Sequence, residues 1–197
     1  SADAAASRRL QYLGWIRTHD TWMMPVLRWL EFNEPGDPRT TRFLQRLEAL
    51  AWMQAIRAQE PARRDNRYLN LVKEIREGRE PEECRTLEVT AADWQHVRSQ
   101  LSGGLYARRR YRHFLLLRIN ASLEGDQGVR HLPDATMEHV FPLKPAAGSR
   151  WLSDFRSAKD LPLRHVLGNF TLLTEAEQNA VRKHALAYQA ASGCSLE

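Results

Sequence analysis

The stretch that decides the fold lies in the last third of the chain. It reads ATMEHVFPL at residues 135–143, LGNFTLL at residues 167–173 and TEAEQNAVRKHALAYQ at residues 174–189. The first two segments are short β-type runs, and the third has the composition of a helix. Thr174 can cap that helix, and Glu177, three residues later, completes a capping box. The order of strand, long loop, strand and capped helix predicts a ββα unit.

The residues before this unit predict helices. Apolar residues recur at helical spacing over most of the first 125 residues, most clearly from Thr40 to Gln59. Pro61 and Pro81 interrupt a charged segment, and Thr90 is expected to cap a further helix. The five tryptophans before residue 100 are expected to pack in the helical core, and a base-stacking surface is the less favoured alternative.

These patterns predict a mainly α protein. Its helical domain spans residues 1–128, and a small ββα unit at residues 129–197 packs on that helical part. With 43% apolar and 27% charged residues, the chain can bury a core and is not a disordered protein. Because the chain starts without Met, we expect it to be part of a longer protein.

The cysteines and the apolar runs exclude several classes of protein. Cys84 and Cys194 have no C-x-x-C partner, which argues against a zinc ribbon or a disulfide scaffold and fits a reducing cytoplasm. No apolar run approaches the roughly 20 residues that cross a bilayer, so no membrane partner is expected. The chain also lacks a G-x-x-x-x-G-K-[ST] loop, so it is not expected to hydrolyse nucleotides by a P-loop mechanism.

Positive charge is concentrated in the second half of the chain. The net charge is +5; residues 101–197 carry 13 Lys and Arg against 9 Asp and Glu, whereas residues 1–100 carry 16 against 15. A polyanionic partner is therefore expected to bind the second half. The candidate phosphate contacts in a helix and in the loop between the strands are Arg108, Arg109, Arg112, Lys144, Arg150 and Arg164. The arginines of the helix also fit a plain solvated face.

Four residues of the ββα unit fit the hydrolysis of a phosphodiester, which needs a base for water and a hard cation. A neutral histidine at a strand end, such as His139, can be the base. The carboxylate of Glu138 and the amides of Asn169 and Asn179 carry oxygens that suit Mg²⁺ or Mn²⁺. Lys183 follows Asn179 by four residues, so a metal ligand and a phosphate-facing cation would share one side of the helix.

The segments at residues 138–142 and 167–173, together with Asn179, resemble the motifs of an HNH (ββα-metal) nuclease. More narrowly, they resemble the C-terminal nuclease domain of GmrSD-type, modification-dependent restriction proteins and of phosphorothioate-sensing (SspE-like) phage-defence proteins. The resemblance covers roughly residues 134–185. It implies a metal-dependent DNA endonuclease, nicking or cleaving, that is the effector domain of a bacterial anti-phage or restriction protein. It further implies DNA as the partner and an N-terminal nucleotide-hydrolysing sensor domain.

The resemblance also implies roles for individual residues. His139 is the general base, Glu138 and Asn179 are the ligands of Mg²⁺ or Mn²⁺, and Asn169 orients the histidine. Leu143 stands where many HNH motifs have Gln, and Glu138 replaces the commoner Asp. Adjacent strand residues point to opposite faces, so Glu138 and His139 serve one site only where the strand is irregular.

A second interpretation belongs to another class of protein: a non-catalytic helical DNA-binding or protein-interaction module with a degenerate ββα unit. In that interpretation His139 is a core histidine, Asn169 is a turn residue, and Asn179 faces solvent. DNA binding would then need no metal and would not depend on His139.

Overall fold

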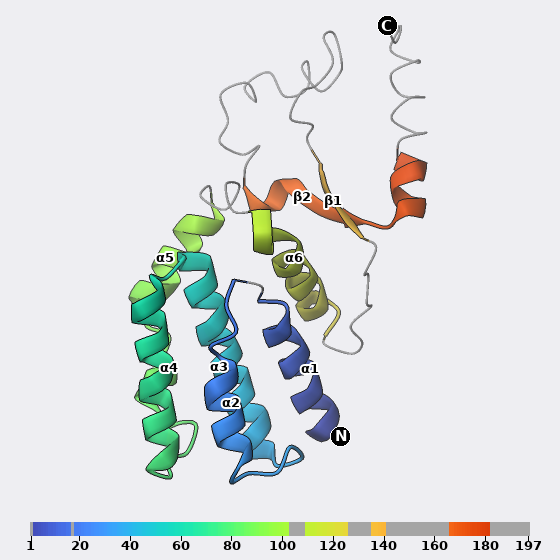
Figure 1. Cartoon of the computed structure of the whole chain (residues 1–197). Coiled ribbons are helices and arrows are strands. Elements are labelled where there is room, and N and C mark those ends of the chain that lie inside the picture. Colours follow the sequence, from blue (N-terminus) through green and yellow to red (C-terminus); the bar gives the residue numbers. More distant parts are fainter. Residues whose placement is uncertain (1, 17, 103–108, 126–134, 141–165, 182–197) are drawn as a thin grey trace, which may run out of the picture. The chain divides into compact units, whose positions relative to one another are not determined.

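The computed structural model describes residues 2–16, 18–102, 109–125, 135–140 and 166–181. These residues are mainly helical and include one two-stranded antiparallel sheet, which confirms the predicted fold class (Figure 1). The chain forms two compact units, Ser1–Gln100 and Leu101–Glu197. The predicted domain boundary at residue 128 lies outside the described residues.

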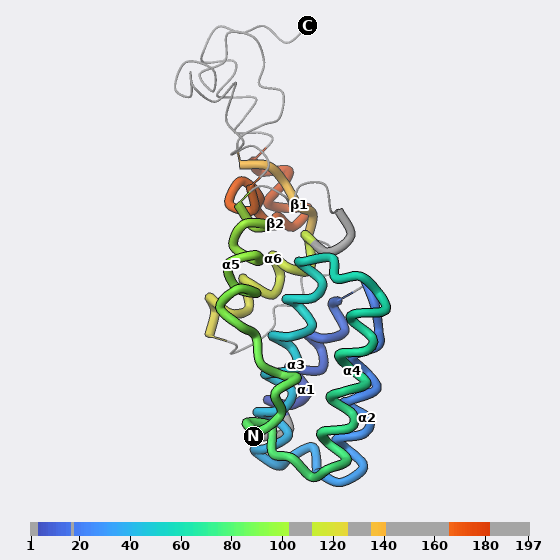
Figure 2. The backbone as a smooth tube through the Cα atoms, turned by 90° about the vertical axis from the view of Figure 1, so that its left-hand side faces the viewer, coloured from blue at the N-terminus to red at the C-terminus, as the bar shows by residue number. Residues whose placement is uncertain are grey.

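The first unit is a bundle of helices in which α1 packs along α3 and α2 packs along α4 (Figures 1 and 2). Its elements are α1 (Ala2–Gly14), α2 (Met23–Leu30), α3 (Pro38–Arg57), α4 (Pro61–Arg76), the 3₁₀ helix η1 (Arg85–Leu87) and α5 (Ala91–Leu101). Helix α3 supplies more of the core than any other helix, because its apolar side chains are almost completely buried along its whole length. The helix predicted from Thr40 to Gln59 is therefore confirmed, starting slightly earlier.

The start of α3 follows from its first residues. The side chain of Asp37 accepts a hydrogen bond of 2.7 Å from the backbone N–H of Arg39, and Pro38 occupies the first helical position. Aspartate satisfies a free N–H at this end, and proline has none to satisfy.

The segment that Pro61 and Pro81 interrupt contains a long helix, α4, which the sequence analysis did not single out. Pro61 begins this helix instead of breaking it. The carboxylate of Glu60 caps the helix by accepting hydrogen bonds from the backbone N–H groups of Ala62 (3.1 Å) and Arg63 (2.9 Å).

The corner between α3 and α4 contains Ala58 in the left-handed region, with a φ of 47°. The N–H groups of Ala58 and Gln59 donate to the carbonyls of Ala55 (3.1 Å) and Gln54 (3.0 Å), which closes the last turn of α3. For a residue other than glycine, this conformation costs about 1–2 kcal/mol of conformational free energy. The corner is therefore tight and fixed by hydrogen bonds.

The tryptophans are only partly core residues. Trp29 is 3% exposed, stacks on Phe43 with a centroid distance of 4.4 Å and donates to Thr40 Oγ1 at 2.9 Å. Trp52 is also buried, which confirms the prediction for these two. Trp94 is 48% exposed, so the prediction of core packing is wrong for it. Val97, three residues further along α5, is an apolar residue that this helix buries, whereas the Trp94 side chain remains about half exposed.

The second unit has the predicted ββα order within the described residues. Helix α6 (Arg109–Leu123) packs against β2 (Phe170–Leu173), which pairs with β1 (Thr136–His139). A short 3₁₀ helix, η5 (Leu167–Asn169), leads into β2, and residues 175–181 are helical. The predicted capping box is confirmed: Glu177 accepts from the backbone N–H of Thr174 at 2.8 Å, and Thr174 Oγ1 accepts from the N–H of Glu177 at 3.3 Å.

Two further expectations concern the cysteines and the membrane. Cys84 is fully buried, and burial raises the pKa of its thiol to about 11, so it is an unreactive core residue. Cys194 lies outside the described residues. Among the helices that the structure describes, none has both the length and the apolar character to cross a bilayer.

Candidate active site

The two strands form a regular antiparallel ribbon. Glu138 lies opposite Thr171, and His139 lies opposite Phe170. Because side chains alternate along a strand, cross-strand partners share a face and sequence neighbours do not. His139 therefore shares a face with Phe170, and Glu138 lies on the other face with Thr171. The pairing is continuous through His139, so β1 shows no irregularity that would bring both side chains to one face.

His139 lies on the face of the ribbon that meets α6. Its ring packs against Phe170, with ring centroids 4.6 Å apart and an interplanar angle of 51°. The guanidinium of Arg112, from α6, lies over the same phenyl ring at 5.1 Å from its centroid. The Nε2 atom of His139 is buried. Contacts with Phe170 thus fix the orientation of the imidazole ring.

Glu138 faces the helix that follows β2. Its Oε1 atom accepts a hydrogen bond from the side-chain amide of Gln178. The backbone N–H of Gln178 donates in turn to the carbonyl of Thr174 at 2.8 Å, within the first turn of that helix. Asn179 is the next residue, and its side chain is exposed. The structure thus links Glu138 to the helix that carries Asn179.

Asn169 lies at the same end of the ribbon as His139. It is 8% exposed, and its carbonyl accepts a hydrogen bond of 2.9 Å from the N–H of Val140. Its own N–H donates to the carbonyl of Val166 at 3.1 Å, which shapes η5. Asn169 therefore ties the entrance of β2 to the residue that follows His139.

The predicted phosphate-binding residues fall mostly in parts of the chain that the structure leaves undescribed. Five of them lie outside the described residues: Arg108, Lys144, Arg150, Arg164 and Lys183. Arg109 is the first residue of α6. Arg112 is 4% exposed and packs on Phe170, so the structure places it inside the packing between α6 and β2, not on a surface open to DNA.

A cavity of about 770 Å³ lies between α6 and β2. None of the four predicted catalytic and metal-binding residues lines it. Most of its walls are apolar or neutral, and two carboxylates, Glu124 and Glu177, lie at its edge. None of its described lining residues is a histidine.

A cation at the predicted site would depend on few protein ligands. Within the described ranges, no group of three or more His, Cys, Asp or Glu side chains is placed to hold a metal ion. Mg²⁺ commonly keeps several waters and uses one or two carboxylates, so Glu138 and an amide oxygen of Asn179 match its preferred donors. Zinc, which favours His and Cys, does not fit this donor set.

The family model described as "GmrSD restriction endonucleases, C-terminal domain" matches residues 91–190, just over half of the chain. The chain belongs to this family. The matched span starts with α5 and includes α6, both strands and all four predicted catalytic and metal-binding residues of this GmrSD C-terminal domain. No curated protein and no solved structure gives a significant match. Membership of a restriction endonuclease family implies a nuclease whose substrate is DNA.

Two residues of the GmrSD domain that contact the predicted site were missed by the sequence analysis. Phe170 packs on His139, and Gln178 bonds to Glu138, although 40 positions separate the latter pair. The one available signal was that each lies beside a predicted residue, Asn169 or Asn179. Only the strand register shows that they meet their partners.

Proposed function

We propose that the chain is a metal-dependent DNA endonuclease of the ββα-metal (HNH) type. It acts as the effector of a bacterial restriction or anti-phage protein, related to the phosphorothioate-sensing (SspE-like) defence proteins. The observation that carries the proposal is the ββα order, with His139 ending β1 and Asn169 preceding β2, in a chain of the GmrSD family.

His139 is the general base in this proposal. Its ring is held by Phe170, which reduces the orientational freedom that a base would otherwise lose in the transition state. In this role the imidazole ring accepts the proton from the attacking water. Asn169 positions the base by anchoring the end of the ribbon, where Val140 donates to its carbonyl.

Glu138 and Asn179 are the residues that would hold Mg²⁺ or Mn²⁺. The hydrogen bond from Gln178 keeps the carboxylate of Glu138 beside the helix that bears Asn179. When bound, the cation supplies charge neutralisation at the scissile phosphate and at the leaving oxygen. The oxygen donors of these two residues match such a hard cation.

DNA binding and the control of the nuclease complete the proposal. Lys183, Lys144, Arg150, Arg164, Arg108 and Arg109 seat the phosphate backbone of DNA, by charge and by position in sequence. An N-terminal nucleotide-hydrolysing sensor domain controls the nuclease in the full-length cytoplasmic protein, as the resemblance implies.

One observation favours a second candidate, a non-catalytic DNA-binding or protein-interaction module. Glu138 and His139 lie on opposite faces of a regular strand, and Glu138 bonds to Gln178. A purely structural Glu138 that secures the helix would produce the same contact. The two candidates predict different effects on DNA nicking when His139 or Glu138 is substituted.

The test is relaxation of supercoiled plasmid by the chain, with Mg²⁺ or Mn²⁺ and with chelator. His139→Ala is expected to lower metal-dependent nicking by about 10²–10⁴-fold, the usual contribution of a general base. His96→Ala, on the exposed surface of α5, is the matched control and retains activity. If the chain alone does not cut, the same variants are compared in the full-length protein.

A second experiment distinguishes between Glu138 as a metal ligand and Glu138 as a structural residue. As a metal ligand, Glu138→Gln raises the concentration of Mg²⁺ needed for half-maximal nicking, because an amide holds a cation less strongly than a carboxylate. If Glu138 is purely structural, Glu138→Gln leaves that concentration of Mg²⁺ unchanged. Nicking that persists fully in His139→Ala would contradict the proposed base.

A further inference from the structure

A small cavity lies at the corner between α3 and α4, in the first unit. Its volume is about 220 Å³, and its lining residues are Gln54, Arg57, Gln59, Arg63 and Arg67. Arg57 is the last residue of α3, and Arg63 and Arg67 are four residues apart on α4, so they share one side of that helix. The corner therefore gathers three guanidinium groups around one opening, and no lining residue is acidic or apolar.

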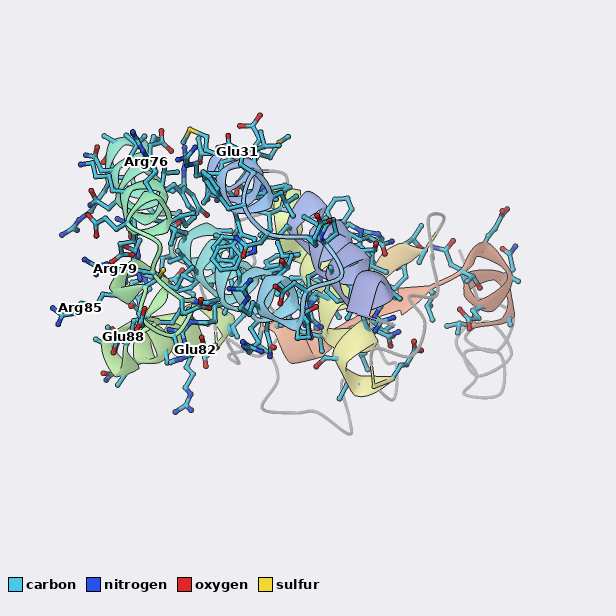
Figure 3. All side chains as sticks on the ribbon, turned by 90° about the horizontal axis from the view of Figure 1, so that it is seen from below. Glu31, Arg76, Arg79, Glu82, Arg85 and Glu88 are labelled. Carbon is cyan, nitrogen blue, oxygen red and sulfur yellow. The ribbon has the colours of Figure 1, made fainter. Side chains whose placement is uncertain are left out.

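Two of these arginines are held in place by the protein itself. Arg57 forms an ion pair with Asp93. Arg67 donates to the carbonyls of Thr86 at 3.0 Å and Glu88 at 2.5 Å; Glu88 is labelled in Figure 3. A guanidinium has more N–H groups than these bonds use. Both arginines are thus preorganised and retain donors, while Arg63 has an exposed side chain.

Gln54 is the observation that points to a ligand. The residue is 2% exposed, and neither its amide nitrogen nor its amide oxygen is hydrogen-bonded to any described residue. Buried polar side chains almost always have partners, and a buried amide without one destabilises the fold. A bound ligand that accepts from the amide nitrogen would remove the part of this cost that the nitrogen contributes.

Positive charge exceeds negative charge around the cavity. Asp93 forms an ion pair with Arg57, whereas Glu60 caps the backbone of α4. Burial is the main cause that lowers the pKa of Arg67, and the neighbouring Arg57 lowers it further, against the opposing effect of Asp93. Three guanidinium groups thus line the cavity, and the carboxylate of Asp93 is bonded to one of them.

We propose that this cavity binds a single phosphate group. Planar guanidinium forks match the oxygens of phosphate with paired hydrogen bonds, and the Gln54 amide adds a neutral donor. The volume is below the roughly 300–1,000 Å³ of sites for drug-sized ligands and well above the roughly 30 Å³ of one water. It therefore fits the phosphate and not an attached nucleoside. The ligand class is free phosphate or a terminal phosphomonoester, such as the 5′ end of a DNA strand.

The test is calorimetric titration of the whole chain with inorganic phosphate, with chloride keeping the ionic strength constant. The chain is expected to bind phosphate, and Arg63→Gln is expected to weaken binding by about tenfold or more. Gln54→Met keeps the volume and removes the amide, and a similar loss is expected. Arg85→Gln changes an exposed arginine that does not line the cavity, and binding should stay within about twofold of wild type.

Two oligonucleotides distinguish the sources of the phosphate. One carries a 5′-phosphate and the other, of the same sequence, does not. Tighter binding of the phosphorylated one, lost in Arg63→Gln, identifies a strand end as the source. Equal binding of both, with inorganic phosphate still bound, identifies free phosphate.

The proposal is wrong if phosphate does not bind at millimolar concentration, or if Arg63→Gln and Gln54→Met both bind it as wild type does. Circular dichroism checks that the variants are folded; Gln54→Met removes an unpaired buried amide and is not expected to unfold the chain. Both residues lie outside the span matched by the nuclease family, so the result is independent of the proposed nuclease function.

Discussion

The two units differ in how they bury their apolar residues. In the first unit, Tyr12, Phe43, Leu47 and Tyr68 are all 0% exposed. In the second unit, no described apolar side chain is that deeply buried, and Phe170, the main contact of its sheet, is 6% exposed. Its strands have four residues each. Among the described residues, most of the deeply buried apolar side chains therefore lie in the first unit, whereas the proposed catalytic residues depend on a few specific contacts in the second.

Removing a core side chain from the first unit is expected to have the largest effect on stability. Leu47→Ala deletes a side chain that is completely enclosed, so the cavity cannot easily collapse. The expected loss in the free energy of unfolding is about 4 kcal/mol, measured by urea denaturation. Leu69→Ala, at a residue 46% exposed on the same unit, is the control and should cost less than about 0.5 kcal/mol. Equal losses would mean that α3 is not the centre of the core.

The corresponding change in the second unit is Phe170→Ala. Because this ring is buried beside a large cavity and contacts His139 and Arg112, the expected loss is smaller, about 2–3 kcal/mol. Hydrogen exchange should show faster opening of β1 and β2, with protection of α3 unchanged. Leu123→Ala, at a residue 81% exposed, is the matched control. Loss of protection in both units together would show that they unfold as one.

A third change tests the acid sensitivity of the first unit. Burial of Asp93 opposes its ionisation, but hydrogen bonds from Thr90 and the charges of Arg57 and Arg67 outweigh it and lower the pKa. A lowered pKa in the folded state stabilises the fold above the unfolded value, about 3.9, and this contribution disappears as pH falls through the folded value.

Asp93→Asn should therefore cost about 1–2 kcal/mol at neutral pH and flatten the fall in stability below about pH 4. Thermal unfolding between pH 3 and 7 measures both effects. Asp20→Asn, at an exposed residue, should retain the wild-type profile. An unchanged pH profile in Asp93→Asn would assign the acid sensitivity to other carboxylates.

The smallest of these effects is expected at the helix cap of the second unit. Thr174→Ala removes the hydroxyl that bonds to the N–H and the carboxylate of Glu177, at a cost of about 1 kcal/mol. Hydrogen exchange should increase at residues 175–181 and remain the same in the first unit. Thr174→Ser retains the cap and is the control. Because Gln178 lies in the same turn, nicking is also expected to fall slightly in Thr174→Ala.

Local features of both units could be predicted from the sequence. Periodic apolar residues predicted α3, and the cap at Thr90 and the capping box at Thr174 depend on residues three positions apart. Helix α4 was not singled out, because its composition is polar and Pro61 looks like an interruption. Its buried residues, Tyr68, Leu71 and Ile75, do recur at helical spacing.

Contacts between distant residues could not be predicted in the same way. The bond between Glu138 and Gln178, and the packing of His139 on Phe170, depend on which residues of the two strands pair. A single sequence gives the alternation within each strand but not the register between them. The phosphate cavity depends on how α4 turns back at the corner, and the arginines that line it are unremarkable in sequence.

The left-handed Ala58 at that corner makes it a place where stability can be engineered. Glycine would remove a conformational cost of about 1–2 kcal/mol but would add roughly 0.4–1 kcal/mol of entropy to the unfolded chain. The net gain of about 0.5 kcal/mol corresponds to about 1–2 °C in melting temperature for a chain of this size. Ala58→Gly is thus a route to a more heat-tolerant protein that leaves every side chain of the cavity in place.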